Sequence, residues 1–278
     1  MIAQALKESI NITLSIFKNK VIWITGASSG IGEAAAVEFA KQGAQLILSA
    51  RRESELIRVS KNCYLASENC LILPFDLNEI SKFSTITEKV IAKFGRIDYL
   101  FNNGGFSQRS DAVNTPLDLD RKIMEVNFFA NIALSKSVLP YMIKQNSGQI
   151  IVVSSIAGKF GFYLRSSYSA AKHALHGFYE SLRLENEQKG IKILVVCPGK
   201  IKTNISLNAL TELGTTHNKM DESHIDCMTA EECVNEIISG IIKNKDEILV
   251  GGKELHAVWI KRFFPKLFNK IIRKQSHF

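Results

Sequence analysis

Val21-Ile-Trp-Ile-Thr-Gly-Ala-Ser-Ser-Gly-Ile-Gly32 is the stretch of sequence that decides the fold. It opens with four apolar residues, a pattern typical of a short buried strand, and continues into a turn rich in glycine. Residues 33–42 then follow a helical pattern that ends before Gly43. The sequence therefore predicts a strand, a glycine-rich turn and a helix in direct succession.

The three glycines of this turn have the spacing of a dinucleotide-binding loop. Gly26 permits the tight turn, Gly30 lets the backbone approach a pyrophosphate, and Gly32 allows close packing of the helix, whose N-terminus supplies N–H donors. We expect the residues between these glycines to belong to the same site; they are Ser28, Ser29 and Ile31. The alternative is a glycine-rich turn without a ligand, and the flanking strand and helix weigh against it.

Six further apolar segments predict the remaining strands, with helical segments between most of them. They span residues 45–50, 71–73, 97–101, 149–153, 191–196 and 247–250. Short apolar strands that alternate with helices indicate a parallel sheet covered on both faces, because parallel strands need crossover connections. We therefore expect a single α/β domain with a doubly wound, Rossmann-type sheet of about seven strands.

The length of 278 residues suits one such domain with extensions at both ends. Residues 1–19 are expected to form an N-terminal helix or arm outside the core, residues 20–252 the Rossmann-type domain, and residues 253–278 a basic, amphipathic extension. The first 17 residues are interrupted by polar and charged side chains, which fits neither a signal peptide nor a membrane-spanning helix.

The five cysteines are irregularly spaced and form no C-x-x-C pair. This pattern favours reduced thiols in a cytoplasmic protein over a disulfide framework, and we predict no metal site. The composition, 46% hydrophobic and 22% charged, is that of an ordinary globular chain.

The residues after the second predicted strand bear on which dinucleotide is bound. A site that prefers NAD carries an acidic residue about 20 residues beyond the glycines, where it binds the ribose 2′-hydroxyl. Here the sequence reads Ser49-Ala-Arg-Arg52. An acidic side chain would repel a 2′-phosphate, whereas Arg51 binds one by charge-assisted hydrogen bonds, with Arg52 and Ser28 as neighbours. We therefore expect the cofactor to be NADP(H). For Arg52 alone, an ordinary solvent-exposed cation is an equally good interpretation.

Tyr168 and Lys172 stand four residues apart in a helical stretch, so they share one face of the helix. The usual pKa of tyrosine is too high for acid or base catalysis at neutral pH, and an adjacent cation lowers it. Ser155 lies thirteen residues upstream, just past the fifth strand, and Asn127 lies on the helix predicted to begin near Asp118. The spacing marks Ser155, Tyr168 and Lys172 as candidate catalytic residues, with Ser154 as a structural neighbour.

Together these motifs resemble the single-domain branch of the short-chain dehydrogenase/reductase family. The resemblance runs from about Lys20 to Val250. It rests on several motifs in the family's order: Thr25–Gly32, Asp76-Leu77, Asn102-Asn-Gly-Gly105, Asn127, Ser154-Ser155, Tyr168-Ser-Ala-Ala-Lys172, and Pro198-Gly199 followed by Thr203. It implies an oxidoreductase that transfers a hydride between nicotinamide and a carbonyl or alcohol.

The resemblance also implies a role for each matching residue. Tyr168 would donate the proton to the carbonyl oxygen, Ser155 would hydrogen-bond that oxygen, and Lys172 would tune Tyr168 and bind the nicotinamide ribose. Asn127 would hold a water that relays protons to Lys172, although an asparagine in a helix is more often a polar filler. The remaining cofactor contacts would come from Asp76, Leu77, Asn103, Gly104, Pro198, Gly199 and Thr203. Residues 200–228 would form the lid over the substrate.

The C-terminal extension concentrates the positive charge of the chain, which is +8 overall. Between residues 257 and 274, apolar pairs recur every four residues with basic residues between them. This spacing predicts an amphipathic helix, kinked at Pro265, of the kind that lies on an anionic membrane surface. It resembles the extension of the membrane-associated member-seven-like group of the family. The alternative is that this apolar face covers the substrate site or a subunit interface.

The sequence is compatible with three hypotheses about function. The first is an active NADPH-dependent reductase of a lipophilic carbonyl, and the others are an inactive nucleotide-binding scaffold and a peripheral membrane-binding protein. Arg165, three residues before Tyr168, is a candidate contact for an acidic group of the substrate. Family members are commonly dimers or tetramers, so we expect a homodimer or homotetramer. A basic excess confined to the tail, with no recognition motif, argues against nucleic acid as a partner.

Overall fold

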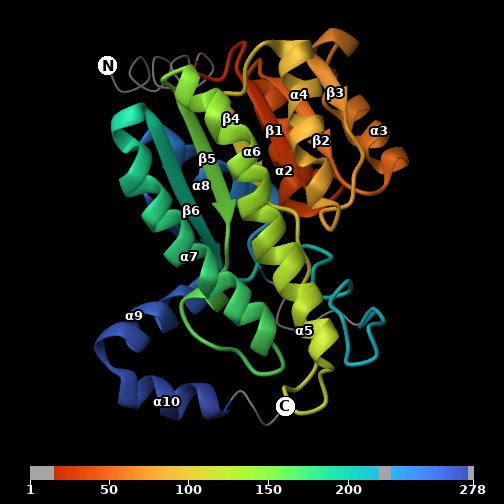
Figure 1. Cartoon of the computed structure of the whole chain (residues 1–278). Helices are drawn as coiled ribbons and strands as arrows, with labels where there is room; N and C mark the ends of the chain where they lie inside the picture. The colour runs from red at the N-terminus through yellow and green to blue at the C-terminus, as the bar shows by residue number, and fades with distance from the viewer. Residues whose placement is uncertain (1–15, 219–226, 275–278) are drawn as a thin grey trace.

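A parallel sheet forms the centre of the molecule in the computed structural model, which describes residues 16–218 and 227–274 (Figure 1). Its seven strands run in the order β3-β2-β1-β4-β5-β6-β7. Their bounds are β1 Val21–Thr25, β2 Gln45–Ser49, β3 Cys70–Ile72, β4 Tyr99–Asn102, β5 Gly148–Val153, β6 Ile191–Pro198 and β7 Glu247–Val250. The prediction of a doubly wound, Rossmann-type sheet in a single domain is confirmed.

The central strands are buried on both faces, as a parallel sheet between helices requires. Every residue of β1 and β5 is buried, which explains why both strands read as continuous apolar runs. The fourth strand begins at Tyr99, two residues later than the sequence predicts. At Ile97 a side chain takes the place of a neighbouring strand, because Ile97 N–H donates to Gln145 Oε1 at 3.1 Å. Asp98 is a transition: its backbone N–H donates to the Val21 carbonyl oxygen at 2.9 Å, and its carboxylate accepts from Val21 N–H at 3.0 Å.

Helices cover both faces of the sheet (Figure 1). One apolar core joins the sheet to α2 Gly30–Lys41, α3 Glu53–Asn62 and α8 Ala230–Ile242. The other core joins it to α4 Phe83–Phe94, α6 Ala130–Lys144 and α7 Ser166–Asn186, while α5 Leu117–Met124 packs beside α7. Short turns of 3₁₀-helix lie at Ser67–Asn69, Ile80–Lys82, Ile156–Gly158, Glu187–Lys189 and Lys253–Leu255.

The topology fixes where a ligand binds. From β1 the chain winds outward to β2 and β3, and then returns to β4 on the other side of β1. The loops after β1 and β4 therefore diverge from neighbouring strands at the carboxyl edge of the sheet, which is where ligands of open α/β folds bind.

Phe17 differs from the expectation that residues 1–19 lie outside the core. Its side chain is fully buried, and its ring centroid lies 4.9 Å from that of Phe39 and 5.3 Å from that of Tyr99. An isolated aromatic residue ahead of the first strand gives no periodic signal, so its burial by α2 was not apparent from the sequence. Residues 1–15 of the expected arm lie outside the described residues.

The C-terminal extension forms two helices rather than one kinked helix. They are α9 His256–Phe263 and α10 Pro265–Lys274, and Figure 1 shows them as an arm below the carboxyl ends of the central strands. Phe264 leaves the helical conformation, with φ −133° and ψ 60°. The residue before a proline is disfavoured in the helical region, and proline suits the first position of the next helix. Among residues 16–218 and 227–274, no helix combines the length and apolar character needed to cross a membrane.

Candidate active site

The glycine-rich loop is shaped by contacts that leave no room for side chains. A Cβ at Gly26 would lie 2.8 Å from Asn103 Nδ2, and one at Gly32 would lie 2.2 Å from the Gly26 carbonyl oxygen. Gly26 and Gly30 also have positive φ angles of 65° and 56°. The three positions therefore require glycine, and the resulting cradle before α2 fits the pyrophosphate of a dinucleotide.

Thr25 ties this loop to the one after β4. Its hydroxyl oxygen accepts hydrogen bonds from the backbone N–H groups of Asn103 and Gly104, both at 3.0 Å. Asn103 Nδ2 donates back to the Thr25 carbonyl oxygen at 3.2 Å, and Leu77 packs so closely on Gly104 that a Cβ there would lie 2.6 Å from Leu77 Cδ1. Sequence reasoning treated Thr25 only as part of the glycine motif and missed this role.

The predicted nucleotide-selecting residues lie at the carboxyl end of β2. Arg51 and Arg52 are exposed directly after this strand. Asp76 follows β3, and its Oδ1 accepts from the backbone and side-chain N–H groups of Asn78, both at 2.9 Å. Arg58, which sequence reasoning missed, donates to the Ser28 carbonyl oxygen at 3.3 Å. It is also paired with Glu33 at 2.6 Å and with Glu55 at 2.9 Å, so these carboxylates offset its positive charge beside the loop.

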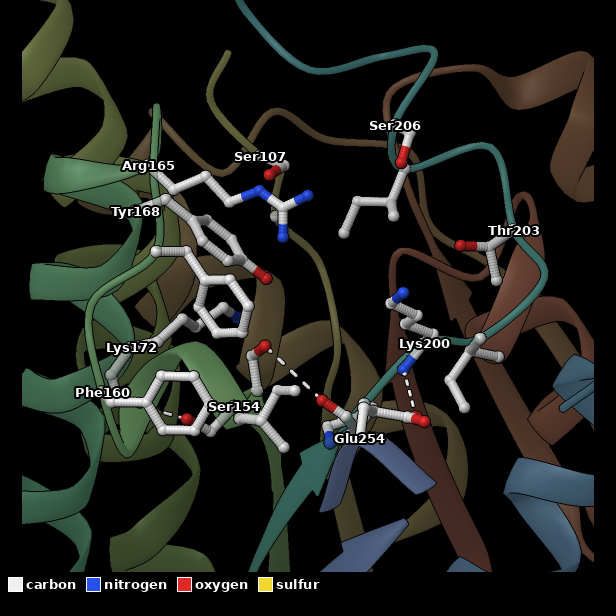
Figure 2. Close-up of a pocket in the computed structure, with 18 of the residues that line it drawn as sticks. Ser107, Ser154, Phe160, Arg165, Tyr168, Lys172, Lys200, Thr203, Ser206 and Glu254 are labelled. Carbon is white, nitrogen blue, oxygen red and sulfur yellow. Dashed lines mark hydrogen bonds between the residues drawn. The ribbon is translucent and has the colours of Figure 1, made fainter. Parts of the chain in front are cut away.

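Ser155, Tyr168 and Lys172 line one cavity of about 790 Å³ at the carboxyl end of the sheet (Figure 2). Ser155 lies in the turn after β5, while Tyr168 and Lys172 lie one turn apart on α7. Lys172 Nζ lies 5.6 Å from the centroid of the Tyr168 ring and donates to the Val153 carbonyl oxygen at 2.8 Å. The three candidate catalytic residues are therefore brought together.

The electrostatics of Tyr168 differ from the expectation that Lys172 lowers its pKa. Burial raises the pKa of Tyr168; the charge of Arg165, a hydrogen bond with Ser155 and the charge of Arg109 oppose that rise. Burial also lowers the pKa of Lys172 to about 8. The physical reason is that Lys172 is itself deeply buried and directed to the Val153 carbonyl oxygen, so the guanidinium groups supply the cationic influence.

Asn127 lies in a single turn of π-helix, Glu125–Phe129, between α5 and α6. It is fully buried, and its Nδ2 donates to the Ile123 carbonyl oxygen at 3.0 Å. Within the described part of the chain, its Oδ1 has no hydrogen-bond partner, and it lies against Gly105, where a Cβ would be 2.5 Å away. Turns of π-helix are frequent at functional sites, and a buried acceptor of this kind fits a bound water.

Ser154 connects the turn after β5 to α7 through hydrogen bonds. Its hydroxyl donates to the Lys172 carbonyl oxygen at 3.1 Å and lies 3.2 Å from His176 Nε2, while His176 Nδ1 lies 3.4 Å from Glu247. Burial alone would raise the pKa of Glu247, but hydrogen bonds from His176 and Lys159 hold it at about 2. These contacts match the expected structural role of Ser154, and they link α7 to β7 through residues that the sequence did not single out.

The C-terminal part of the chain completes the cavity. Glu254 Oε1 accepts from the backbone N–H groups of Lys200 at 2.8 Å and Gly252 at 3.0 Å. It lies so near Gly199 that a Cβ there would be 2.2 Å away, which explains the need for glycine after Pro198. Sequence reasoning did not single out Glu254.

The apolar face of α10 covers one side of this cavity. Phe268 is 4% exposed and meets the Phe160 ring edge-on, with a centroid separation of 4.8 Å. Ile271 and Ile272 also line the cavity. Part of the apolar surface of the extension therefore packs against this cavity, as the alternative in which the extension covers the substrate site requires.

Nine of the predicted site residues line this cavity: Ile31, Asn103, Asn127, Ser155, Tyr168, Lys172, Pro198, Gly199 and Thr203. The others lie outside its lining, along the glycine loop and after β2, β3 and β4: Gly26, Ser28, Ser29, Gly30, Gly32, Arg51, Arg52, Asp76, Leu77 and Gly104. The residues that line the cavity and the residues outside it adjoin each other where Thr25 connects the loops after β1 and β4. One extended cofactor could therefore contact both groups, with its nicotinamide end in the cavity and its adenosine end beside β2 and β3.

An oxidoreductase on a Rossmann-type sheet is the class of protein that this arrangement fits. Comparison with known proteins narrows the class: the chain belongs to the short-chain dehydrogenase family, whose sequence model matches residues 20–213. It is 39% identical over 262 residues to a dehydrogenase/reductase SDR family protein 7-like from Drosophila melanogaster, covering 92% of this chain and 80% of the fly protein. It is 41% identical over 253 residues to human dehydrogenase/reductase SDR family member 7, covering 88% and 74%.

A solved structure shares the fold. A short-chain dehydrogenase/reductase from Burkholderia phymatum, in complex with NAD, superimposes with a TM-score of 0.80 at 22% identity and covers 90% of this chain and 95% of its own. At this identity the likeness concerns the fold, and the relatives above establish the family.

Proposed function

We propose that this chain is an NADP(H)-dependent oxidoreductase that transfers a hydride between nicotinamide and a carbonyl or alcohol group of a lipophilic substrate. The observation that carries the proposal is the convergence of Ser155, Tyr168 and Lys172 on one cavity beside the glycine cradle. The aromatic and aliphatic side chains on one side of that cavity support a substrate with an apolar body.

When bound, NADPH would supply a hydride. The side chains of the protein would supply the proton and orient the substrate. Tyr168 donates the proton to the carbonyl oxygen, and Ser155 orients that oxygen through a hydrogen bond. Burial raises the pKa of Tyr168, and the charges of Arg165 and Arg109 and the hydrogen bond with Ser155 act against that rise, which supports proton donation from the phenol. Lys172 would bind the nicotinamide ribose, and a water that donates a hydrogen bond to Asn127 Oδ1 would return a proton toward Lys172.

The preference for NADP(H) is supported by the residues directly after β2. Arg51 and Arg52 are exposed at its carboxyl end, and residues 49–52 contain no acidic side chain that would repel a 2′-phosphate. Ser28 adds a hydroxyl group from the glycine loop. The cofactor would extend from these residues, past Asp76 and Leu77, to Thr203 above the cavity.

A cofactor titration tests this proposal. Quenching of protein fluorescence should show NADPH binding at least ~10-fold more tightly than NADH, and Arg51→Ala should remove most of that preference. Arg121→Ala is the matched control, because this arginine is 70% exposed and pairs only locally with Asp118 on α5. Failure of both dinucleotides to bind would overturn the proposal. Binding of NADPH without turnover of any carbonyl or alcohol would favour the inactive nucleotide-binding scaffold instead.

A second candidate function is attachment to a membrane surface through residues 257–274. Five apolar side chains of α9 and α10 and of the residue between them are 40–64% exposed: Trp259, Phe263, Phe264, Leu267 and Ile271. The same two helices carry six basic residues and no acidic one. This combination is that of a helix lying on anionic lipid. The protein would then be cytoplasmic and peripheral to the membrane.

Vesicle co-sedimentation tests the membrane candidate. The full chain should bind vesicles rich in phosphatidylserine more than neutral ones, and Trp259→Ala with Phe263→Ala should reduce that binding. Leu184→Ala is the control, since Leu184 is 72% exposed on a different helix. Equal binding by both variants would exclude the arm as the attachment site. Sedimentation analysis in the same buffer would test the expected homodimer or homotetramer.

A further inference from the structure

Gln108 is a fully buried polar residue that sequence reasoning did not single out. It lies in the segment after β4, sixty residues before Tyr168, and its side-chain amide makes hydrogen bonds through both its oxygen and its nitrogen. Burying an amide costs free energy unless its polar atoms are paired. The partners of this amide therefore indicate what the residue does.

The amide oxygen of Gln108 caps the N-terminal end of α7. Gln108 Oε1 accepts from the backbone N–H groups of Ser167 at 3.0 Å and of Tyr168 at 3.2 Å. The first N–H groups of a helix have no acceptor within the helix, and the N-cap residue of α7 is Arg165, whose side chain has no acceptor atom. Gln108 therefore supplies from a distant segment the acceptor that an N-cap side chain usually supplies.

The amide nitrogen of Gln108 is held by hydroxyl groups. Gln108 Nε2 donates to Ser110 Oγ at 3.1 Å, to Thr115 Oγ1 at 3.3 Å and to Ser166 Oγ at 3.4 Å. The hydroxyl groups of Ser110 and Thr115 are also hydrogen-bonded to each other at 2.8 Å. Because backbone N–H groups only donate, the side of the amide that faces α7 must be its oxygen. The amide therefore has one orientation, fixed at both ends.

The backbone around Gln108 joins three segments. Arg109 N–H donates to the Leu210 carbonyl oxygen at 2.8 Å, and Ser110 N–H donates to the Leu164 carbonyl oxygen at 3.2 Å. Leu210 belongs to the segment expected to form the substrate lid, and Leu164 lies in the turn before α7. Gln108 is therefore fixed where the segment after β4 meets both the lid segment and the start of α7.

The position of the first turn of α7 matters because it carries Tyr168. Tyr168 is the third residue of the helix, and its phenol reaches into the cavity (Figure 2). A proton donor must lie within hydrogen-bonding distance of the atom that receives the proton, and a misplacement of ~1 Å can cost up to ~100-fold in rate. Gln108 itself lies outside the lining of the cavity, so it acts through Tyr168.

We propose that Gln108 is a positioning residue of the reaction: its amide oxygen fixes the first turn of α7 and thereby holds the Tyr168 phenol at the reacting carbonyl oxygen. This inference rests on the function proposed above, because Tyr168 is the proton donor of that function. Replacing Gln108 should therefore slow proton transfer without weakening the binding of NADPH.

Amide hydrogen exchange tests the anchor without turnover. In exchange followed by NMR, the Tyr168 N–H should lose at least ~10-fold of its protection in Gln108→Met and regain most of it in Gln108→Glu, which keeps an acceptor oxygen. Gln145→Met is the matched control, because Gln145 Oε1 also accepts from a backbone N–H, that of Ile97 at 3.1 Å, at the opposite edge of the sheet. It should leave exchange at Tyr168 unchanged. Unchanged protection in Gln108→Met would overturn the inference.

Turnover measures the consequence for the reaction. With NADPH and 4-nitrobenzaldehyde, Gln108→Met should lower kcat by ~10-fold or more and raise the solvent deuterium isotope effect on kcat, with the Kd for NADPH within ~2-fold of that of the unchanged chain. Gln108→Glu should recover most of kcat, and Gln145→Met should leave it within ~2-fold. A loss of kcat without a larger isotope effect, or without recovery in Gln108→Glu, would show a merely structural role and overturn the inference.

The inference and the proposed function fail in different ways. Absence of turnover of this aldehyde and of every other tested carbonyl by the unchanged chain would contradict the proposed function, and this inference with it. Equal turnover by Gln108→Met and the unchanged chain would overturn the inference alone. Gln108→Asn takes the place of Gln108→Met in both measurements if the latter does not fold, since its side chain is one methylene shorter and its oxygen cannot reach the same N–H groups.

Discussion

Replacing Gly32 by alanine tests whether the glycine loop is shaped by steric contact, as the structure indicates. The added methyl group would lie 2.2 Å from the Gly26 carbonyl oxygen and 2.7 Å from Asn103 Nδ2. Neither atom is the end of a flexible side chain: the first is backbone, and the second is held by the Thr25 carbonyl oxygen at 3.2 Å. The loop must therefore move away from α2 to admit the methyl group.

The expected change in stability follows from two opposing effects. Overpacking typically costs ~1–3 kcal/mol, whereas alanine in place of helical glycine contributes at most ~1 kcal/mol. Gly32→Ala should therefore change the free energy of unfolding by between zero and about −3 kcal/mol. Gly177→Ala is the matched control. It lies in α7 with nothing within 4 Å of the added Cβ, so it should gain up to ~1 kcal/mol.

Gly32→Ala should affect the affinity for the dinucleotide more than it affects the free energy of unfolding. The loop that must move presents the backbone to the pyrophosphate and is tied to Asn103, so Gly32→Ala should weaken NADPH binding by ~10-fold or more. Urea denaturation and NADPH titration of both variants measure the two effects. The steric explanation is refuted if Gly32→Ala gains stability as Gly177→Ala does and binds NADPH as the unchanged chain does.

Substitutions at three further positions, Phe268, Glu247 and Glu254, test contacts that sequence reasoning did not identify. Phe268→Ala should cost ~3–5 kcal/mol and raise KM for apolar substrates, because Phe268 is buried. Phe263→Ala, at 62% exposure, should change stability by less than ~0.5 kcal/mol; thermal unfolding and kinetics measure both. Because the pKa of Glu247 is about 2 against an ordinary 4.5, its carboxylate stabilises the fold above pH 4.5, and this contribution is lost as the pH falls toward 2. Glu247→Gln should therefore show a smaller loss of Tm over that interval, and an unchanged profile would contradict the assignment. Glu254→Ala should weaken NADPH binding in fluorescence titration, because it leaves two backbone N–H groups of the loop without their acceptor, and Glu254→Gln should restore part of it.

The sheet and the catalytic motif were predictable because their signals are local. Strands buried on both faces read as apolar runs, and residues 21–24 of β1, 150–153 of β5 and 193–197 of β6 have that pattern in the sequence alone. Tyr168 and Lys172 are one helical turn apart, so their shared face follows from the spacing. The glycine positions likewise report a backbone requirement, which the contacts of Gly26 and Gly32 now explain.

The contacts that sequence reasoning missed join segments far apart in the chain. Glu254 binds a loop more than fifty residues before it, and Arg58 reaches back from α3 to Ser28. Neither has a periodic or motif signal, because each depends on how two loops approach each other after folding. The same holds for the influence of Arg109 on Tyr168, since β4 and α7 meet only in the folded sheet.

The C-terminal extension has one side that lines the cavity and another that is exposed to solvent. Its inner side places Phe268 against Phe160, whereas its outer side exposes Trp259 and Phe263 between basic residues. Deleting the arm would therefore open the cavity and remove the candidate membrane surface at once, and a loss of activity would not tell the two apart. Substitutions on one side at a time do separate them: outer changes should alter vesicle binding with KM in detergent-free buffer unchanged, and Phe268→Ala should do the reverse. If an outer substitution altered KM without vesicles present, the two sides would be coupled through the packing of α9 on α10, and the arm would act as one movable wall of the site.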